Sequence, residues 1–354
     1  MADKKIVHVV GTGTIGEPLI GLLTDMKVAF GIDEVTFHKR TPLIDERAKV
    51  EDLVRRGAKL AVNKEGKSEF EKIGHKPVYD HIEALERATV VIDCTPAGNE
   101  NKASLYNKIK GPKGFIAQGS EFGFGRPYAR GINDESLNRA EDRFIHVVSC
   151  NTHNLSVLIK TLAGTPDGKI RLKEGRFVCM RRANDISQDK DFNPSPKAGK
   201  HDDKDYGTHH ARDAAHLFKT LGVNLNLFSS AIKLNTQYMH SVWFDLTLED
   251  KMTRDQAIAR LKENPRIALT QKTSANQVFS FGRDHGFFGR ILSQTVVSVP
   301  TITTRGDNEL IGFCFTPQDG NALLSSLTAM LWFMYPEGFE ERIDAIRPYL
   351  FREI

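Results

Sequence analysis

A cysteine stands between an apolar run and a helical pattern in the segment FIHVVSCNTHNLSVLIKTL, residues 144–162. The run FIHVV is rich in β-branched residues, as a buried strand is, and the apolar residues after it recur at helical spacing. Ser149, Asn151 and Thr152 are residue types that cap helix starts, so the unpaired N–H groups of the first turn should face Cys150. The helix start favours a thiolate over a thiol, and we interpret Cys150 as a nucleophile.

A cysteine nucleophile is usually assisted by a base that titrates near neutral pH, and His240 in QYMHSVW is the candidate. Taken alone, a histidine among large apolar strand residues is more often a core residue, so this interpretation depends on Cys150. Arg181 and Arg182 end another apolar run, as an anion site or as an exposed strand end. His209 and His210 follow the polar segment 183–207, and their spacing favours an anion site over zinc. No metal is predicted.

The start of the chain carries the spacing G-x-G-x-x-G between an apolar strand pattern and a helical one, with glycines at positions 11, 13 and 16. Gly11, Gly13 and Gly16 would allow a tight turn and close approach of a pyrophosphate to a helix start. The next strand, EVTFH, is followed by Lys39 and Arg40 where an NAD site usually offers an acidic residue. This favours NADP, and the alternative is a solvated basic turn.

Apolar runs at 88–98, 113–121 and 143–150 alternate with helical patterns at 45–61 and 99–110. This alternation predicts an α/β fold with a doubly wound parallel sheet of the Rossmann type. Thr95, Pro96 and Gly119 lie in loops after strands, at the edge where such sheets bind ligands. After Cys150, strand patterns around the helix 253–263 predict an α+β domain, and residues 320–351 predict helices that return to the first domain. We expect domains at 1–149, 150–315 and 316–354.

The composition excludes several classes of protein. The chain has 354 residues, 40% hydrophobic and 27% charged, with a net charge of +4, as in an ordinary globular protein without a nucleic-acid partner. Three FGR elements, at 124–126, 281–283 and 288–290, are too few for an RNA surface and are interpreted as turns. Four scattered cysteines indicate reduced thiols, and the lack of a long apolar run excludes a membrane span. We expect a cytoplasmic protein.

Eight segments together, GTGTIG, VIDCTPAG, FIAQGSE, VVSCNT, RRA, THHARDA, MHSV and PQDGNAL, resemble the archaeal-type (type II) phosphorylating glyceraldehyde-3-phosphate dehydrogenases in order and spacing. The resemblance implies that Cys150 is the nucleophile and His240 the catalytic histidine. It implies substrate contacts at Ser149, Asn151, Thr152, Arg181, Arg182, His209 and His210. It adds cofactor contacts at Thr14, Ile15, Gly119 and Gln318. Similar proteins are cytoplasmic homotetramers that use NADP or NAD with a phosphorylated aldehyde and inorganic phosphate, in glycolysis or gluconeogenesis.

Two departures from the family pattern affect the substrate more than the reaction type. His153, Asn154 and Leu155 stand where the family usually has Thr-Gly-Leu, and residues 211–213 read Ala-Arg-Asp where it has Gly-Pro-Asp. The expected chemistry is a thiohemiacetal on Cys150, hydride loss, and a thioester that phosphate cleaves. The alternatives are a reductase of another acyl phosphate or acyl thioester, of the semialdehyde dehydrogenase type, and a catalytically inactive nucleotide-binding regulator whose pocket is blocked by His153.

Overall fold

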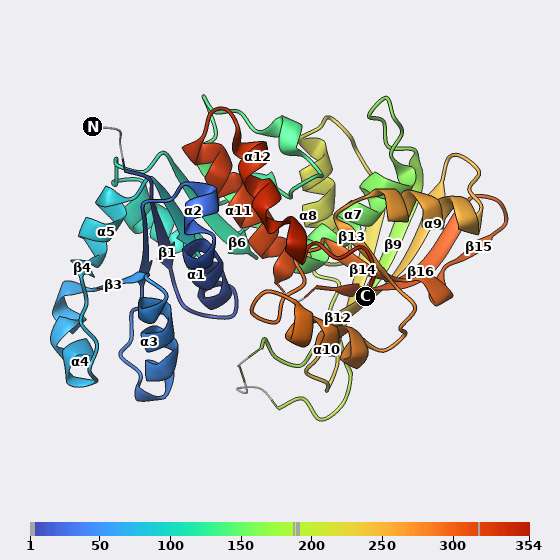
Figure 1. The fold of residues 1–354 in the computed structure, drawn as a ribbon. Helices are drawn as coiled ribbons and strands as arrows, with labels where there is room; N and C mark the ends of the chain where they lie inside the picture. The colour runs from blue at the N-terminus through green and yellow to red at the C-terminus, as the bar shows by residue number, and fades with distance from the viewer. Residues whose placement is uncertain (1–3, 187, 189–191, 318) are drawn as a thin grey trace. The chain divides into compact units, whose positions relative to one another are not determined.

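The computed structural model describes residues 4–186, 188, 192–317 and 319–354, and the chain forms two compact units (Figure 1). The first unit comprises Met1–Arg126, Asn138–Val147 and Ser325–Arg347. The second comprises Pro127–Leu137, Val148–Leu324 and Pro348–Ile354. The domains expected at 1–149, 150–315 and 316–354 stay a prediction.

The first unit is built on an eight-stranded sheet with the order β4-β3-β2-β1-β5-β6-β8-β7. The pairs from β4 to β6 are parallel, and β1, β2 and β5 are buried along their whole length, as expected for a sheet covered on both faces. The predicted Rossmann-type sheet is therefore confirmed. Its strands are β1 (Ile6–Val10), β2 (Glu34–His38), β3 (Lys59–Val62), β4 (Tyr79–Asp80), β5 (Val90–Asp93), β6 (Gly114–Gly119), β7 (Arg126–Tyr128) and β8 (Phe144–Val148).

Helices connect the successive strands of this sheet. They are α1 (Gly16–Asp25), α2 (Lys27–Phe30), α3 (Arg47–Arg55), α4 (Lys67–Lys72), α5 (His81–Arg87) and α6 (Gly98–Asn101). The single helical pattern predicted over 45–61 is wrong at its end, because α3 stops at Arg55 and β3 begins at Lys59. Gly57 between them has a φ of 105°, a backbone conformation that glycine tolerates and that ends the helix.

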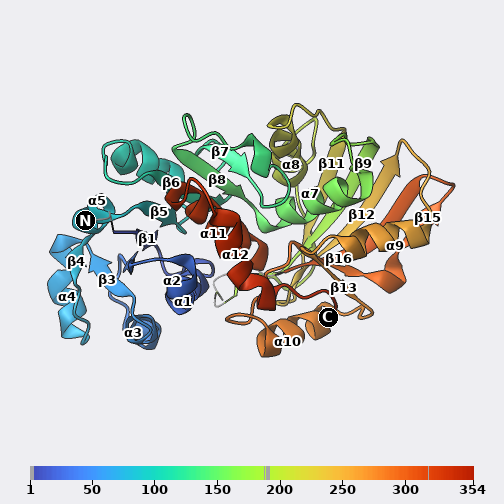
Figure 2. The ribbon, with the colours of Figure 1, turned by 45° about the horizontal axis from the view of Figure 1, so that its top comes forward.

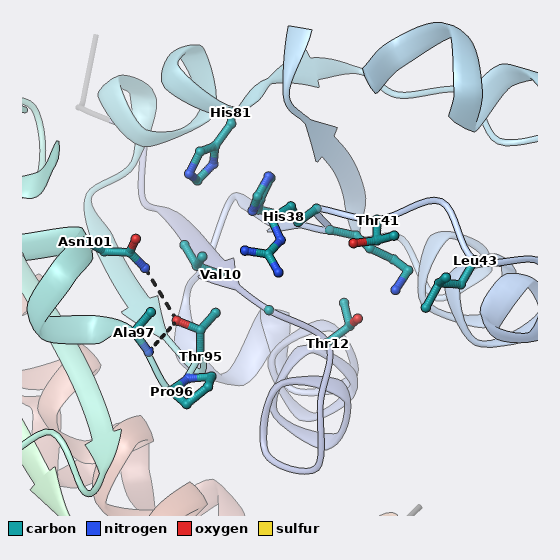
Figure 3. Close-up of a pocket in the computed structure, with 13 residues that line it drawn as sticks. Val10, Thr12, His38, Thr41, Leu43, His81, Thr95, Pro96, Ala97 and Asn101 are labelled. Carbon is teal, nitrogen blue, oxygen red and sulfur yellow. Dashed lines mark hydrogen bonds between the residues drawn. The ribbon is translucent and has the colours of Figure 1, made fainter. Parts of the chain in front are cut away.

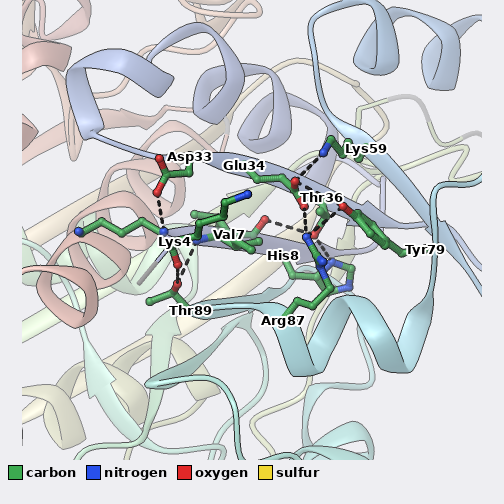
Figure 4. A network of polar contacts seen from close by, with 12 residues as sticks. Lys4, Val7, His8, Asp33, Glu34, Thr36, Lys59, Tyr79, Arg87 and Thr89 are labelled. Carbon is green, nitrogen blue, oxygen red and sulfur yellow. Dashed lines mark hydrogen bonds and ion pairs between the residues drawn. The ribbon is translucent and has the colours of Figure 1, made fainter. Parts of the chain in front are cut away.

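The carboxylate of Glu34 ties three elements of the first unit to β2 (Figure 4). It is almost buried and accepts hydrogen bonds from Lys59 (2.5 Å), Arg87 (3.2 Å) and Tyr79 (3.4 Å). Burial alone would raise the pKa of Glu34, but these donors hold it below its usual value. The network therefore fixes β3, β4 and α5 beside β2, which ends at one of the predicted cofactor segments.

Two C-terminal helices, α11 (Gly320–Met334) and α12 (Phe339–Ile343), follow the second unit, and Ser325–Arg347 belongs to the first. A Cβ atom on Gly114 of β6 would lie 2.2 Å from the ring of Phe333, so glycine at 114 lets that ring pack on the sheet. The hydroxyl of Tyr335 donates to the carbonyl oxygens of Phe30 and Gly31, each at 2.9 Å. These contacts confirm the predicted return of the C-terminal helices.

The second unit has a mixed sheet with the order β10-β11-β9-β12-β16-β14-β13, and β15 pairs with β16 (Figure 2). β9 is parallel to β11 and antiparallel to β12, which confirms the α+β expectation. The strands are β9 (Leu172–Arg181), β10 (Lys197–Ala198), β11 (Leu227–Lys233), β12 (His240–Leu248), β13 (Ile267–Thr270), β14 (Thr295–Ser298), β15 (Thr303–Arg305) and β16 (Glu309–Thr316). The helices are α7 (Cys150–Ala163), α8 (His209–Lys219), α9 (Arg254–Glu263) and α10 (Ala275–His285).

The helix α7 lies at the centre of this unit and contacts α8, α9 and the strands β9 and β12. Its leucines and Ile159 are buried in one core with Phe177, Phe218 and Phe244. The predicted helix 253–263 is confirmed, and its start carries a capping box between Thr253 and Gln256. This packing holds the first turn of α7, and with it Cys150, against the sheet.

Two helices of the second unit were not predicted. α8 follows directly on the polar segment 183–207, and α10 buries only Val278 and Gly282, so its apolar pattern is weak. The interpretation of 281–283 as a turn is wrong because these residues lie inside α10. The turn at 288–290 is confirmed by left-handed backbone at Phe288 and Gly289, with φ of 49° and 72°.

None of the described helices is long and apolar enough to cross a membrane. All four cysteines are free thiols.

Candidate active site

A cavity of about 350 Å³ lies in the first unit at the carboxyl ends of β1, β2 and β5 (Figure 3). Five of the predicted cofactor residues line it: Gly11, Lys39, Arg40, Thr95 and Pro96. Gly13, Thr14 and Ile15 lie between β1 and α1, and Gly16 begins α1, but these four residues do not line the cavity. Gly119 ends β6 and is also outside it, and Gln318 lies outside the described residues.

The glycine turn has the geometry that close approach of a phosphate requires. Gly11 has a φ of 95°, and its N–H donates to the carbonyl of His38 at 3.1 Å. A Cβ atom on Gly16 would lie 2.1 Å from the carbonyl oxygen of Gly11, so a larger residue does not fit there. A Cβ atom on Gly13 would meet nothing within 4 Å, which leaves open space above the helix start. This turn fits the pyrophosphate of a dinucleotide.

The loop after β5 is shaped by the buried carboxylate of Asp93. Its Oδ1 accepts from the N–H and the hydroxyl of Thr95, at 2.8 and 2.6 Å. Its Oδ2 accepts from Asn101 and Tyr106, at 2.8 and 2.6 Å. Four hydrogen bonds to one carboxylate therefore fold the loop that borders the cavity, and Asn101, which the sequence analysis did not single out, is part of the cavity wall.

The two basic residues after β2 differ in their surroundings. Lys39 is buried and forms an ion pair with Glu46, which also binds Lys49 at 2.6 Å. Arg40 is exposed and lines the cavity, and no described residue forms an ion pair with it. Arg40 is therefore the cation of the pair that remains open to an anionic ligand.

The same cavity has a wall of stacked imidazoles that the sequence analysis did not identify. The rings of His38 and His81 are 3.7 Å apart and nearly parallel (Figure 3). The ring of His8 does not line the cavity and lies 5.6 Å from the ring of His81. Burial lowers the pKa of His38 to about 3 and that of His81 to about 4. Both side chains are therefore neutral near pH 7. The available signal for His81 was its place directly after Asp80, whose side chain caps α5.

In the second unit, Cys150 is the first residue of α7, as predicted. Ser149 is its N-cap, with the side-chain oxygen accepting from the N–H of Thr152 at 3.3 Å. The carbonyl oxygen of Cys150 accepts a hydrogen bond from the side-chain amide of Asn321 at 2.9 Å. The predicted change from strand to helix at Cys150 is thus confirmed. The cap at Ser149 and the hydrogen bond from Asn321 fix the backbone on either side of the cysteine sulfur.

The low thiol pKa that the helix start predicts is wrong for this site. Burial of the sulfur and, after it, the carboxylate of Asp319 raise the pKa of Cys150 to about 12, although Arg182 and Arg181 act in the opposite direction. Loss of water around the sulfur therefore outweighs the helix start.

His240 is the first residue of β12 and lies opposite Thr316 of β16. Its Nδ1 accepts a hydrogen bond from the backbone N–H of Arg182 at 3.0 Å. Burial, with Arg182 and Arg181 nearby, lowers the pKa of His240 well below its usual value. The ring is therefore neutral, and because Nδ1 is an acceptor, the proton is assigned to Nε2. His240 offers an N–H donor rather than a free base.

The predicted arginine and histidine pairs separate into two environments. A second cavity of about 350 Å³ is lined by Arg181, His209 and His210, with Lys200 and Arg212. Arg182 is buried instead, with one nitrogen on Asp185 at 2.7 Å and its Nε and Nη1 without hydrogen-bond partners. Burial lowers the pKa of both histidines, and the ring nitrogens of His210 have no partners. Asp202 and Asp203 also line the second cavity, but its three cationic side chains outnumber them, so it is a basic pocket that can receive an anion.

Asp319 is a site residue that the sequence analysis missed. It is buried, its Oδ2 has no hydrogen-bond partner, and it adopts a φ of 58° just before α11. Burial raises its pKa to about 6, against the opposing effect of Arg182 and Arg290. Asp319 and Cys150 are far apart in the sequence, and only the fold brings the carboxylate close enough to act on the thiol. A local sequence pattern therefore does not reveal this effect.

His153 does not occupy an accessible surface. It is fully buried, and its Nδ1 is 3.0 Å from the carbonyl oxygen of Ser149 in the preceding turn. Among the described residues, no three His, Cys, Asp or Glu side chains are arranged to hold a metal ion.

A dinucleotide-type glycine turn and a helix-start cysteine with a buried histidine are typical of cysteine-dependent dehydrogenases. No protein-family model matches the chain. Curated relatives are named glyceraldehyde-3-phosphate dehydrogenase. The Methanobacterium bryantii protein is 30% identical over 301 residues, 80% of each chain. The Pyrobaculum neutrophilum protein is 27% identical over 86% of this chain and 85% of its own. The Sulfurisphaera tokodaii protein is 26% identical over 93% and 94%. The chain belongs to the archaeal glyceraldehyde-3-phosphate dehydrogenase family, which confirms the resemblance.

Proposed function

We propose that this protein oxidises glyceraldehyde 3-phosphate to 1,3-bisphosphoglycerate with inorganic phosphate and NADP or NAD, and catalyses the reverse reaction, as a homotetramer. The observation that carries the proposal is that a helix-start cysteine and a neutral histidine with an N–H donor both lie near Arg181 and Arg182. Family membership supports the same reaction.

Cys150 is the nucleophile of the proposed reaction. Its sulfur bonds to the aldehyde carbon, and the thiol proton ends on the former carbonyl oxygen, which gives a thiohemiacetal. The Nε2–H of His240 and the free N–H groups at the start of α7 stabilise the negative charge that develops on this oxygen. When the carbon is oxidised, the hydroxyl proton is released to water and a thioester remains on Cys150. Phosphate then attacks its carbonyl carbon, and the thiolate leaves.

The residues of the first unit fit a nicotinamide dinucleotide, because the space at Gly13 above the helix start is open to a pyrophosphate and Arg40 lines the cavity after β2. The cofactor, when bound, supplies the acceptor for the hydride. We favour NADP, since Arg40 is an exposed cation beside the cavity where a 2′-phosphate is recognised in such sheets. The substrate phosphate is assigned to the basic pocket of Arg181, His209 and His210.

The test follows nicotinamide reduction after purified protein is mixed with glyceraldehyde 3-phosphate, inorganic phosphate and NADP or NAD. We expect turnover that requires phosphate and is lost in Cys150→Ser. Cys179→Ser is the matched control, since it removes a buried thiol of the core and should retain turnover. Turnover without phosphate, or equal turnover in Cys150→Ser, would contradict the proposal.

A further inference from the structure

We propose that Asn154 and Thr316 are positioning residues that orient the side-chain amide of Asn151, so that its N–H donors face the reacting oxygen beside Cys150. The inference rests on the proposed function for the identity of that oxygen. It concerns residues that the family pattern does not supply, because Asn154 stands where the family usually has glycine.

A directed chain of hydrogen bonds joins four buried side chains of the second unit. The thiol of Cys314 donates to Oδ1 of Asn154 at 3.2 Å, and Nδ2 of Asn154 donates to the hydroxyl of Thr316 at 2.8 Å. The hydroxyl of Thr316 in turn donates to Oδ1 of Asn151 at 3.0 Å. A threonine hydroxyl has a single proton, and because Thr316 gives this proton to Asn151, the oxygen of the Asn151 amide and not its nitrogen faces Thr316.

Burial makes this chain specific. Cys314, Asn154, Thr316 and Asn151 each expose 2% of their surface or less, and buried polar groups are rarely left without partners. Because Oδ1 of Asn151 accepts the hydrogen bond from Thr316, Nδ2 of the same amide and its two N–H groups point away from Thr316. Among the residues that the structure describes, none accepts a hydrogen bond from this Nδ2. The Asn151 amide is therefore a donor held in place with no acceptor among these residues.

The chain also lies between the two reacting side chains of the second unit. Asn151 follows Cys150 in the first turn of α7, and Thr316 is paired with His240 across β12 and β16. A donor fixed at this point adds to the Nε2–H of His240 and the helix-start N–H groups around the oxygen that becomes negatively charged. Without the Thr316 hydroxyl, the Asn151 amide is free to turn by half a rotation and present its oxygen instead, which would repel that charge.

The test is a double-mutant cycle on Thr316 and Asn151. Thr316→Val removes the hydroxyl at nearly constant volume, and Thr316→Ser keeps it as the matched control. We expect Thr316→Val to lower kcat about tenfold with little change in KM, as for loss of one aligned donor. Thr316→Ser should stay within about twofold. In an Asn151→Ala background, Thr316→Val should cause no further loss. Asn154→Ala should reproduce the loss if Thr316→Val does not fold.

The cycle is repeated on a reaction that needs neither cofactor nor the phosphorylated aldehyde. p-Nitrophenyl acetate acylates a nucleophilic cysteine: the sulfur bonds to the carbonyl carbon, and p-nitrophenolate leaves and is measured by its absorbance. Equal losses in Thr316→Val and Thr316→Ser, or additive losses with Asn151→Ala, would overturn the inference. A non-additive cycle on this ester in a protein that does not oxidise glyceraldehyde 3-phosphate would support the inference and contradict the proposed function.

Discussion

Removal of the negative charge beside the nucleophile should make it more reactive. Asp319 is buried near Cys150 and raises the pKa of its thiol, second only to burial itself. The variant Asp319→Asn removes the charge and keeps the shape of the side chain. Asparagine also tolerates the left-handed backbone at this position, where φ is 58°. The substitution should therefore change the electrostatics of the site with little change in the fold.

The magnitude follows from the charge of one buried carboxylate. Two unit charges about 6 Å apart in a medium of effective dielectric constant about 20 interact with about 3 kcal/mol, or about two pKa units. Such a fall in the Cys150 pKa raises the thiolate fraction about 100-fold, and the lower basicity of the thiolate takes back about tenfold in rate. We expect Asp319→Asn to be alkylated about tenfold faster than the wild type near pH 8.

The dependence on pH is the sharper part of this prediction. The pKa of Asp319 is raised to about 6, so in the wild type this carboxyl is ionised at pH 8 and mostly neutral at pH 5. The rate ratio of variant to wild type should therefore approach one at pH 5 and grow as the pH rises through 6.

The assay measures the rate of Cys150 alkylation by iodoacetamide between pH 5 and pH 8, with the modified residue located by peptide mass. Cys179 and Cys314 are buried, and burial together with Asp93 raises the pKa of Cys94 well above its usual value, so these thiols should react slowly in both proteins. Cys150→Ser gives the background. A ratio near one at pH 8, or a tenfold ratio that persists at pH 5, would refute the electrostatic role of Asp319.

Two further predictions concern the first unit. His38 and His81 have pKa values lowered by burial to about 3 and about 4, so the unfolded chain binds more protons below its histidine pKa of about 6.5. The free energy of unfolding is then highest above pH 6.5 and decreases as the pH falls, by about 2 kcal/mol for each histidine at pH 5. A midpoint of urea unfolding that is the same at pH 7 and pH 5 would contradict this prediction. In the cofactor cavity, Arg40→Ala should weaken NADP binding about tenfold and NAD binding less than about twofold, by titration of intrinsic fluorescence. Lys39→Ala should affect the binding of NADP and NAD equally, because Lys39 is paired with Glu46. An equal loss of affinity for both cofactors in Arg40→Ala would exclude the proposed contact between Arg40 and the 2′-phosphate.

Local patterns predicted the elements whose environment is uniform. β1, β2 and β5 are buried along their whole length, and their β-branched and aromatic residues made them recognisable although buried polar residues such as Glu34 and His8 interrupt them. The cap at Ser149 and the capping box at Thr253 are likewise local, and both were visible as residue types before a helical pattern. β3 and β4 are only four and two residues long, and α10 is largely exposed, so their patterns were too short or too polar to recognise.

For the candidate site, the positions of Cys150 and His240 at the starts of α7 and β12 could be expected from residue type and setting, but their electrostatics could not. Their roles in a reaction stay a prediction. The high pKa of Cys150 and the protonation of His240 at Nε2 depend on Asp319 and on the backbone of Arg182, which lie far away in sequence. The stacking of His38 and His81 likewise needs contact between strand β2 and helix α5, which spacing alone does not reveal.

The most direct test of the account is the mass of the protein after a single turnover without phosphate. The enzyme is mixed with excess glyceraldehyde 3-phosphate and NADP or NAD in phosphate-free buffer, quenched in acid, and digested for peptide mass analysis. We predict one 3-phosphoglyceroyl group on the peptide that contains Cys150, and its disappearance when phosphate is added before the quench. Reduced cofactor formed without this thioester, or an acyl group on another residue, would contradict the covalent mechanism.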